Sequence, residues 1–162
     1  MNSTNNYIEP TQQMTSRTDW FCVGKASTFE NLASSNRSGT ETTLAGQCKA
    51  FLIPQEGQEA TECTGGSVHN QVIVFAYKGR IHAMDHSCPH SSYPLSRGTV
   101  FDIEDFGVVL SAGLTCAKHG WSFDLFSGRG DRGNYRLGLW DVDLRGDEGA
   151  DKEVWVKRRK AP

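Results

Sequence analysis

The sequence predicts an all-β domain, a sandwich or barrel built from short antiparallel strands. No long stretch carries the hydrophobic period of a helix. The chain contains 17 glycines, which divide it into short runs that end in turns. Two adjacent runs, 71–77 and 80–84, are rich in β-branched and aromatic residues and are joined by two residues, as in a β-hairpin. Short strands with frequent glycine turns are typical of sandwiches and barrels.

The individual strands are predicted from apolar runs bounded by turn residues. The first run ends at Gly24, the second is closed by Pro54, and Lys78-Gly79 forms the hairpin turn. Polar stretches at 33–47 and 55–70 are expected to be loops. The predicted strands are residues 19–24, 49–53, 71–77, 80–84, 121–126 and 154–156, and a further apolar run, Val108-Val109-Leu110, leads into Cys116.

Two Cys/His pairs stand out as candidate metal ligands. Cys88 and His90 form a Cys-x-His pair, Cys116 and His119 form a Cys-x-x-His pair, and 25 residues (91 to 115) separate them. A mixed-ligand [2Fe–2S] centre needs this set, with two Cys on one iron and two His on the other. Zinc also accepts two Cys and two His, but zinc sites more often pair Cys with Cys and His with His. We therefore expect one [2Fe–2S] cluster per chain, with zinc or a metal-free fold as the alternative.

Length and composition predict the number of domains and exclude some kinds of partner. A chain of 162 residues is one domain that can bury a core without disulfides. The formal net charge of −2 argues against nucleic acid or an anionic membrane as the main partner. No apolar run is long enough to span a membrane. We expect a cytoplasmic monomer in which Cys22, Cys48 and Cys63 are reduced, structural thiols.

The segment from Cys88 to Trp121 resembles the Rieske family, and more narrowly the soluble Rieske-type ferredoxins. This resemblance extends roughly over residues 19–158, and its ligand motifs are its most specific part. It implies an antiparallel β base that carries a small cluster-binding subdomain of two ligand loops. It also implies that Cys88 and Cys116 bind the inner iron, and His90 and His119 the outer one. The matching residues are 22–24, 82–85, 88–90, 94–95, 98, 103–106, 116–121, 123–125 and 128.

Four positions indicate which branch of the family the chain resembles. Rieske proteins of respiratory complexes have a disulfide between the ligand loops, whereas Tyr93 and Lys118 stand at the corresponding positions here. They also place hydroxyl donors near the cluster sulfurs, whereas Trp121 and Phe123 stand there in this chain. Because such donors raise the reduction potential, we expect a value at the low end of the Rieske range, about −150 mV.

The resemblance also indicates two departures and a domain division. The ligand pairs lie further apart than in most oxygenase-type members, which predicts an insertion around 99–110. Residues 128–139, with Arg129, Arg132 and Arg136, are expected to replace a proline loop that often covers the cluster. We expect a disordered polar tail at 1–18, a Rieske domain at 19–158 with its cluster-binding part at about 83–130, and a basic end at 159–162.

We expect no mononuclear iron domain like that of a Rieske oxygenase, because the chain ends too soon to carry one. The first hypothesis is therefore a ferredoxin that passes single electrons from a reductase to an oxygenase or another redox enzyme. The second is a Rieske subunit or stand-alone catalyst in a biosynthetic oxidation. The third is a zinc-binding or metal-free interaction module with a Rieske fold.

The remaining polar residues are assigned structural roles. His82 is expected within a strand, His86 to hydrogen-bond nearby backbone, and Asp85 to cap the turn into the first loop. The acidic residues 141–153 are interpreted as a solvated loop, and 157–160 as a basic tail. Both could also bind a redox partner electrostatically.

Overall fold

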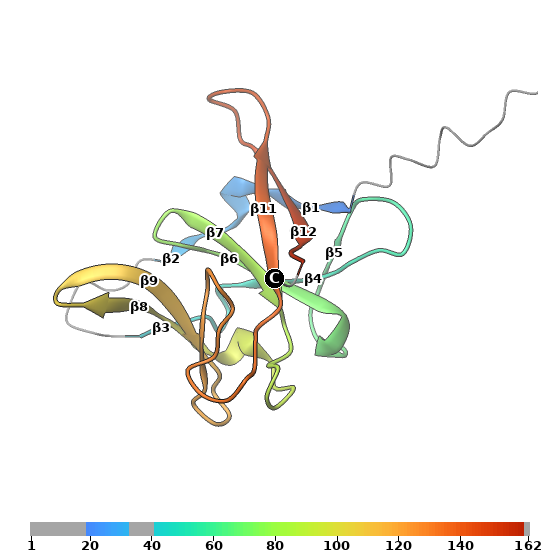
Figure 1. Ribbon diagram of the computed structural model, residues 1–162. Coiled ribbons are helices and arrows are strands. Elements are labelled where there is room, and N and C mark those ends of the chain that lie inside the picture. The colour runs from blue at the N-terminus through green and yellow to red at the C-terminus, as the bar shows by residue number, and fades with distance from the viewer. Residues whose placement is uncertain (1–18, 33–40, 161–162) are drawn as a thin grey trace, which may run out of the picture.

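The computed structural model describes residues 19–32 and 41–160, which form two mainly antiparallel sheets (Figure 1). The predicted all-β class is confirmed. Within the described residues, the helical segments are three-residue 3-10 turns at Ala26–Thr28, Val68–Asn70 and Leu95–Arg97. None of the helices in this part of the chain has the length and apolar character needed to cross a membrane. The predicted tail at 1–18 lies outside the described residues.

The larger sheet carries most of the strands. Its order is β1-β12-β11-β7-β6-β4-β5, and β2 runs parallel to β6 at one side. Its strands are β1 (Trp20–Lys25), β2 (Asn31–Leu32), β4 (Lys49–Leu52), β5 (Thr61–Cys63), β6 (Gln71–Tyr77), β7 (Arg80–Asp85), β11 (Leu139–Arg145) and β12 (Glu153–Arg158). The smaller sheet has the order β10-β9-β8-β3. Its strands are β3 (Thr42–Thr43), β8 (Thr99–Asp105), β9 (Val108–Thr115) and β10 (Ser122–Asp124).

The β6–β7 hairpin is the centre of the fold, as its sequence predicts. Every residue of β6 is buried, because alternate side chains enter two different cores. Phe75 faces the core that also holds Cys88 and Cys116, whereas Val74 faces a second core within the larger sheet. Lys78 and Gly79 both have positive φ, at 50° and 79°, as a two-residue hairpin turn requires. The hairpin therefore gives the first ligand loop a rigid base.

The prediction of a solvated loop at 141–153 is wrong. Residues 139–145 form β11, which pairs along its length with β12, so only the turn between these strands is a loop. Acidic side chains are tolerated here because their carboxylates bind arginines. Asp141 accepts from Arg159 Nε at 2.7 Å, and Asp143 from Arg145 Nε at 3.0 Å. The many acidic residues made this segment look like a loop in the sequence, although it forms a strand.

Other boundaries also differ from the prediction. The segment predicted to be a loop at 55–70 contains β5, and the one at 33–47 contains β3, while residues 33–40 lie outside the described part. The strand predicted at 121–126 ends at Asp124, since its Oδ1 accepts from the backbone N–H of Phe126 at 2.7 Å and of Ser127 at 2.9 Å. A side chain that binds the backbone in this way forms a turn and ends the strand.

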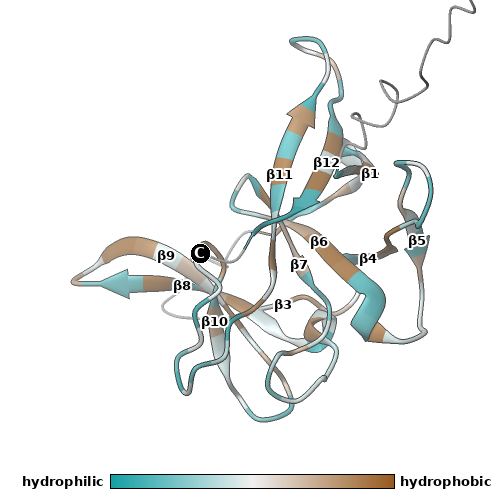
Figure 2. Ribbon diagram, turned by 45° about the vertical axis from the view of Figure 1, so that its right-hand side comes forward, coloured by the Kyte–Doolittle hydropathy of each residue, from teal (hydrophilic) through white to brown (hydrophobic). Residues whose placement is uncertain are grey.

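The residues around 99–110, where an insertion is expected, form a projecting hairpin of β8 and β9 (Figure 1). Phe106 and Gly107 form its turn, both with positive φ, and Phe106 is 99% exposed. Figure 2 shows hydrophobic colour on the projecting part of β9, where Val108, Val109 and Leu110 are exposed. This hairpin extends away from the body of the domain.

His82 makes the stability of the domain sensitive to acid. Its ring lies between Phe75 and Phe126, with centroids 5.7 and 5.3 Å away. Burial, helped by the charge of Arg80, lowers the pKa of His82 from its ordinary value of 6.5 to about 4. The unfolded chain therefore takes up a proton at a higher pH than the folded chain. We expect the free energy of unfolding to fall by about 3 kcal/mol as the pH drops from about 6.5 to 4.

Denaturant unfolding across this pH range, for the wild type and His82→Phe, measures the effect. Phenylalanine keeps an aromatic ring between the two phenylalanines but cannot titrate, so the part of the slope that His82 causes should disappear. An undiminished slope in the variant would assign the acid sensitivity to other groups.

Candidate metal centre

The first ligand loop is closed by its own backbone. The loop leaves β7 and returns to β8. The Cys88 N–H donates to Tyr93 O at 3.0 Å, and the Ser92 N–H donates back to Cys88 O at 2.8 Å. Ser92 sits in the left-handed region, with φ of 60°. The turn holds Cys88 at its base, leaves residues 89–91 half-buried and exposes Ser92.

The second ligand loop, between β9 and β10, repeats this geometry. The Cys116 N–H donates to Trp121 O at 2.8 Å, and the Gly120 N–H donates to Cys116 O at 3.0 Å. Gly120 has φ of 72°, so it takes the place of Ser92. Each loop thus has a cysteine at its first position and a left-handed residue four positions later. The two loops form a matched pair, and only the position of the histidine differs.

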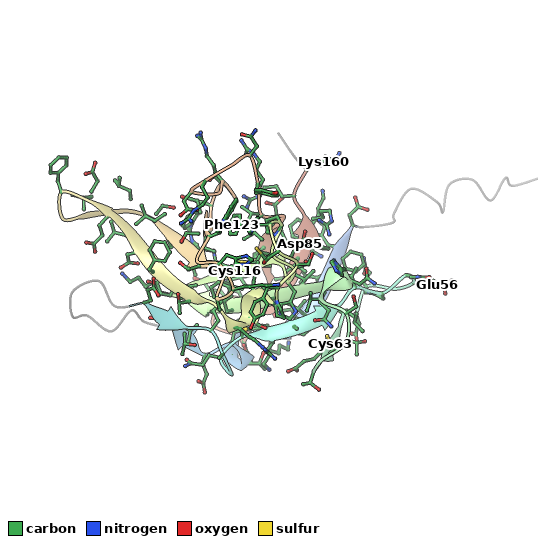
Figure 3. All side chains as sticks on the ribbon, turned by 90° about the horizontal axis from the view of Figure 1, so that it is seen from below. Glu56, Cys63, Asp85, Cys116, Phe123 and Lys160 are labelled. Atoms are coloured by element: carbon green, nitrogen blue, oxygen red, sulfur yellow. The ribbon has the colours of Figure 1, made fainter. Side chains whose placement is uncertain are left out.

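The two cysteines meet in the interior, between the two loops. Each is 1% exposed, and both belong to the core that β6 shares with the smaller sheet. In Figure 3, Cys116 lies in the middle of the molecule, while Glu56 lies at its outer edge. The Ser91 hydroxyl of the first loop lies 3.7 Å from Cys116 Sγ of the second loop. Both cysteines are free, so their sulfurs remain available as ligands.

The two histidines form the outer part of the same site. The His90 and His119 rings have centroids 5.2 Å apart, and His119 is exposed to solvent. His90 Nδ1 is buried and has no hydrogen-bond partner among the described residues. A buried nitrogen without a partner is costly unless a metal or water satisfies it. This orphaned nitrogen therefore fits a metal ligand, and buried thiols beside it fit the same chemistry.

Residues 128–139, hereafter the third loop, cover the histidine side of the site as the sequence predicts. Trp121 stacks on His90 with centroids 3.8 Å apart and planes 6° from parallel. Tyr135 of the third loop packs edge-on against both rings, at 5.4 Å from His90 and 5.2 Å from Trp121. The Arg132 guanidinium lies 5.6 Å from the Trp121 ring. The aromatic cover orients His90 and excludes water from one of its faces.

A buried network beneath the first loop replaces the expected backbone contact of His86. His86 Nδ1 lies 2.7 Å from Gln71 Oε1, and His86 Nε2 lies 2.6 Å from Ser96 Oγ. Gln71 Nε2 donates to Gly65 O at 2.7 Å, which leaves Gln71 Oε1 to accept from His86. Burial lowers the pKa of His86, consistent with a neutral ring that donates through Nδ1 and accepts from Ser96. The network ties both ends of the first loop to β6.

The expected cap at Asp85 is also wrong. Its carboxylate accepts from Trp140 Nε1 at 2.9 Å and from both terminal nitrogens of Arg158, at 3.2 and 3.3 Å. Gly138 lies so close that a Cβ there would be 2.1 Å from Asp85 Oδ2. Asp85 therefore joins the start of the first loop to β11 and β12 instead of capping a turn.

The structure places all four predicted ligands on two adjoining loops, with the cysteines buried at the bases and the histidines further out. Within residues 19–32 and 41–160, no three His, Cys, Asp or Glu side chains are grouped as they would be around a single ion. A mixed-ligand [2Fe–2S] cluster does not need such a group, because each iron takes only two protein ligands. Sequence reasoning missed Ser91, Tyr135 and Gln71. Ser91 follows His90 directly, which is the one available signal, whereas Tyr135 and Gln71 reach the site only through folding.

Comparison with known proteins identifies the family. A family model of the Rieske [2Fe-2S] domain matches residues 19–136. The chain belongs to the Rieske family. A Rieske domain binds a [2Fe–2S] cluster through two Cys and two His and serves in electron transfer. A human Rieske domain-containing protein is 41% identical over 64 residues, which are 39% of this chain and 38% of that protein. The similarity therefore spans well under half of this curated relative.

Solved structures show the same Rieske fold at low identity. One is a chain of the complex of reduced oxygenase and oxidized ferredoxin in carbazole 1,9a-dioxygenase, with a TM-score of 0.50 and 19% identity. The alignment covers 88% of this chain and 97% of that one. The other is a Mycobacterium tuberculosis protein proposed as the small subunit of an NADH-dependent nitrite reductase. It has a TM-score of 0.50 and 16% identity, over 88% of this chain and 96% of that one. At these identities the likeness concerns the fold.

Proposed function

We propose that this Rieske protein is a soluble ferredoxin that passes single electrons from a reductase to an oxygenase or another redox enzyme. Cys88 and Cys116 would hold the inner iron, and His90 and His119 the outer one. When bound, the [2Fe–2S] cluster accepts and releases one electron. The observation that carries the proposal is the contrast between the two ends of the site, since both cysteines are 1% exposed while His119 is exposed to solvent.

This contrast suits an electron carrier for a physical reason. The buried cysteines and the core around them would exclude water from the inner side of the site. The aromatic cover of Trp121 and Tyr135 fixes the His90 ring, so little rearrangement is needed when the charge changes. His119 reaches the surface, where it would shorten the path to a partner protein. The chain's own residues would thus exclude water from the cysteine side of the cluster and give the electron a route to the surface on the histidine side.

A redox titration of the holoprotein tests the proposal. The protein should take up one electron per chain from dithionite and return it to ferricyanide, repeatedly and without loss of iron. Incubation with NADH and oxygen, but without a reductase, should consume neither. Steady consumption by the protein alone would instead favour the stand-alone catalyst. A chain that takes up no electron at all would contradict the proposal.

Ser91 is expected to raise the reduction potential of the centre. With Cys116 as a thiolate ligand, the Ser91 hydroxyl at 3.7 Å can only donate to Sγ. A donor to a ligand sulfur stabilises the reduced form, which is the more negative one. We expect Ser91→Ala to lower the midpoint potential by roughly 40 mV, the equivalent of about 1 kcal/mol for one electron.

Potentiometric titration of Ser91→Ala beside Ser92→Ala measures this effect. Ser92 lies in the same loop, but its hydroxyl makes no hydrogen bond to either cysteine sulfur, so its variant should keep the wild-type potential. Equal midpoint potentials in the wild type and both variants would show that the Ser91 hydroxyl does not act as a donor to the cluster.

A further inference from the structure

A groove of about 660 Å³ lies beside the third loop. Its walls come from the third loop, from the C-terminal end of β12 and from the start of β1. Phe21, Leu137, Leu139 and Trp140 give it apolar lining. Asp19 is its one acidic lining residue. Its basic lining residues are Arg136, Lys157, Arg158, Arg159 and Lys160.

Neighbouring carboxylates neutralise only part of this charge. Arg158 pairs with Asp85, and Arg159 pairs with Asp141. No described carboxylate forms an ion pair with Arg136, Lys157 or Lys160, and the Lys157 ammonium lies 5.9 Å from the centre of the Trp20 ring. The groove therefore keeps an excess of positive charge. In Figure 3, Lys160 lies on the side of the molecule opposite Cys63, which marks β5.

The groove adjoins the metal centre through the third loop. Arg136 follows Tyr135, whose ring packs against His90. Arg159 holds the two walls together, because its N–H donates to Leu139 O at 3.0 Å and its guanidinium donates to Phe126 O at 2.8 Å. A molecule bound in the groove would thus lie next to the histidine side of the site. These hydrogen bonds hold the Arg159 guanidinium in place between the walls.

Two hairpins away from the groove carry negative charge. The projecting hairpin carries Asp102, Glu104 and Asp105, and the turn after β11 carries Asp147 and Glu148. The net charge of −2 therefore conceals a positive region beside the centre and negative regions at two hairpins. Such an asymmetry orients an approaching charged partner before contact.

We propose that this basic groove docks a carboxylate-rich surface segment of the protein that exchanges electrons with the centre. The inference rests on the proposed ferredoxin function and adds the chemistry of the partner. Arg158 and Arg159 keep 61% and 42% of their side-chain surface exposed. Exposed charges bind a single small anion weakly. Several carboxylates on one protein surface can engage the separate cations together, and apolar contacts with Phe21 and Trp140 add to them.

Binding of a hexaglutamate peptide to the oxidised holoprotein tests the proposal. Calorimetric titration at low salt should show binding that weakens as salt is added. In Arg136→Glu/Lys160→Glu, the affinity should fall about tenfold or more. The control is Lys25→Glu/Lys152→Glu, which changes the net charge equally at the opposite end of β12, where the backbone of Lys25 on β1 lies opposite that of Glu153 on β12. The control should keep near wild-type affinity.

Three other results would contradict the proposed docking surface. Equal losses in the two double variants would mean that bulk charge drives binding. Tighter binding of citrate than of hexaglutamate at the same residues would make the groove a small-anion site. If the wild type does not bind hexaglutamate, the groove is not a docking site for a carboxylate-rich segment. Dithionite reduction of every variant is a separate readout, so failure of the electron-carrier proposal is distinguishable from failure of the groove.

Discussion

Replacing Cys116 with serine is expected to reduce iron from two atoms per chain to nearly none. Cys116 is 1% exposed and lies at the base of its loop, so no other described side chain replaces it without refolding the turn. A serine hydroxyl at this position keeps nearly the same volume but is a far poorer ligand than a thiolate for iron–sulfur chemistry. Iron and acid-labile sulfide analysis of the purified variant measures the loss.

Cys63→Ser is the matched control for this variant. Cys63 lies on β5, outside both ligand loops, and burial and the nearby Glu62 charge raise the pKa of its thiol. Its replacement should leave iron and sulfide at the wild-type level. If Cys116→Ser keeps its iron, or if Cys63→Ser loses as much, the ligand assignment is wrong.

Gly98→Ala is expected to separate the two ligand loops. Gly98 ends the first loop, and a Cβ there would lie 2.3 Å from Thr115 O, the backbone oxygen just before Cys116. Backbone cannot yield as a flexible side chain does, so the loops must move apart. We expect a loss of at least about 2 kcal/mol in the free energy of unfolding. The reconstituted protein should also hold less iron, because the two cysteines would no longer meet.

Gly57→Ala distinguishes loop separation from ordinary loss of glycine. Gly57 has φ of 82° and open space where a Cβ would lie, so alanine adds backbone strain but no clash. This variant should lose about 1 kcal/mol and keep its full iron content. Full iron in Gly98→Ala, measured together with wild-type stability, would show that the loops tolerate a wider separation.

The sequence was informative where local chemistry determines structure. The β6–β7 hairpin was predictable because its strands are rich in β-branched and aromatic residues, and because Lys78-Gly79 between them suits a two-residue turn. The four candidate ligands were predictable because few chemistries use mixed Cys/His pairs at this spacing. Strand β11 was not predictable, since the carboxylates of Asp141 and Asp143 look solvated until Arg159 and Arg145 are placed beside them.

The other features that the sequence did not predict depend on contacts between segments that are distant in the chain. Asp85 reads as a turn cap, yet its partners, Trp140 and Arg158, lie 55 and 73 residues further along the chain. His86 reaches Gln71 only because β6 and β7 pair. The basic residues 157–160 read as a terminal tail until β12 places them beside the third loop. Long-range pairing, which no local pattern encodes, created each of these arrangements.

The electron paramagnetic resonance spectrum of the dithionite-reduced protein, with iron and sulfide analysis of the same sample, tests the central claim most directly. We expect two irons per chain and the low average g-value that distinguishes a mixed Cys/His [2Fe–2S] cluster from an all-Cys one. A silent spectrum with zinc in the metal analysis, or a spectrum typical of four cysteine ligands, would contradict the assignment of Cys88, His90, Cys116 and His119.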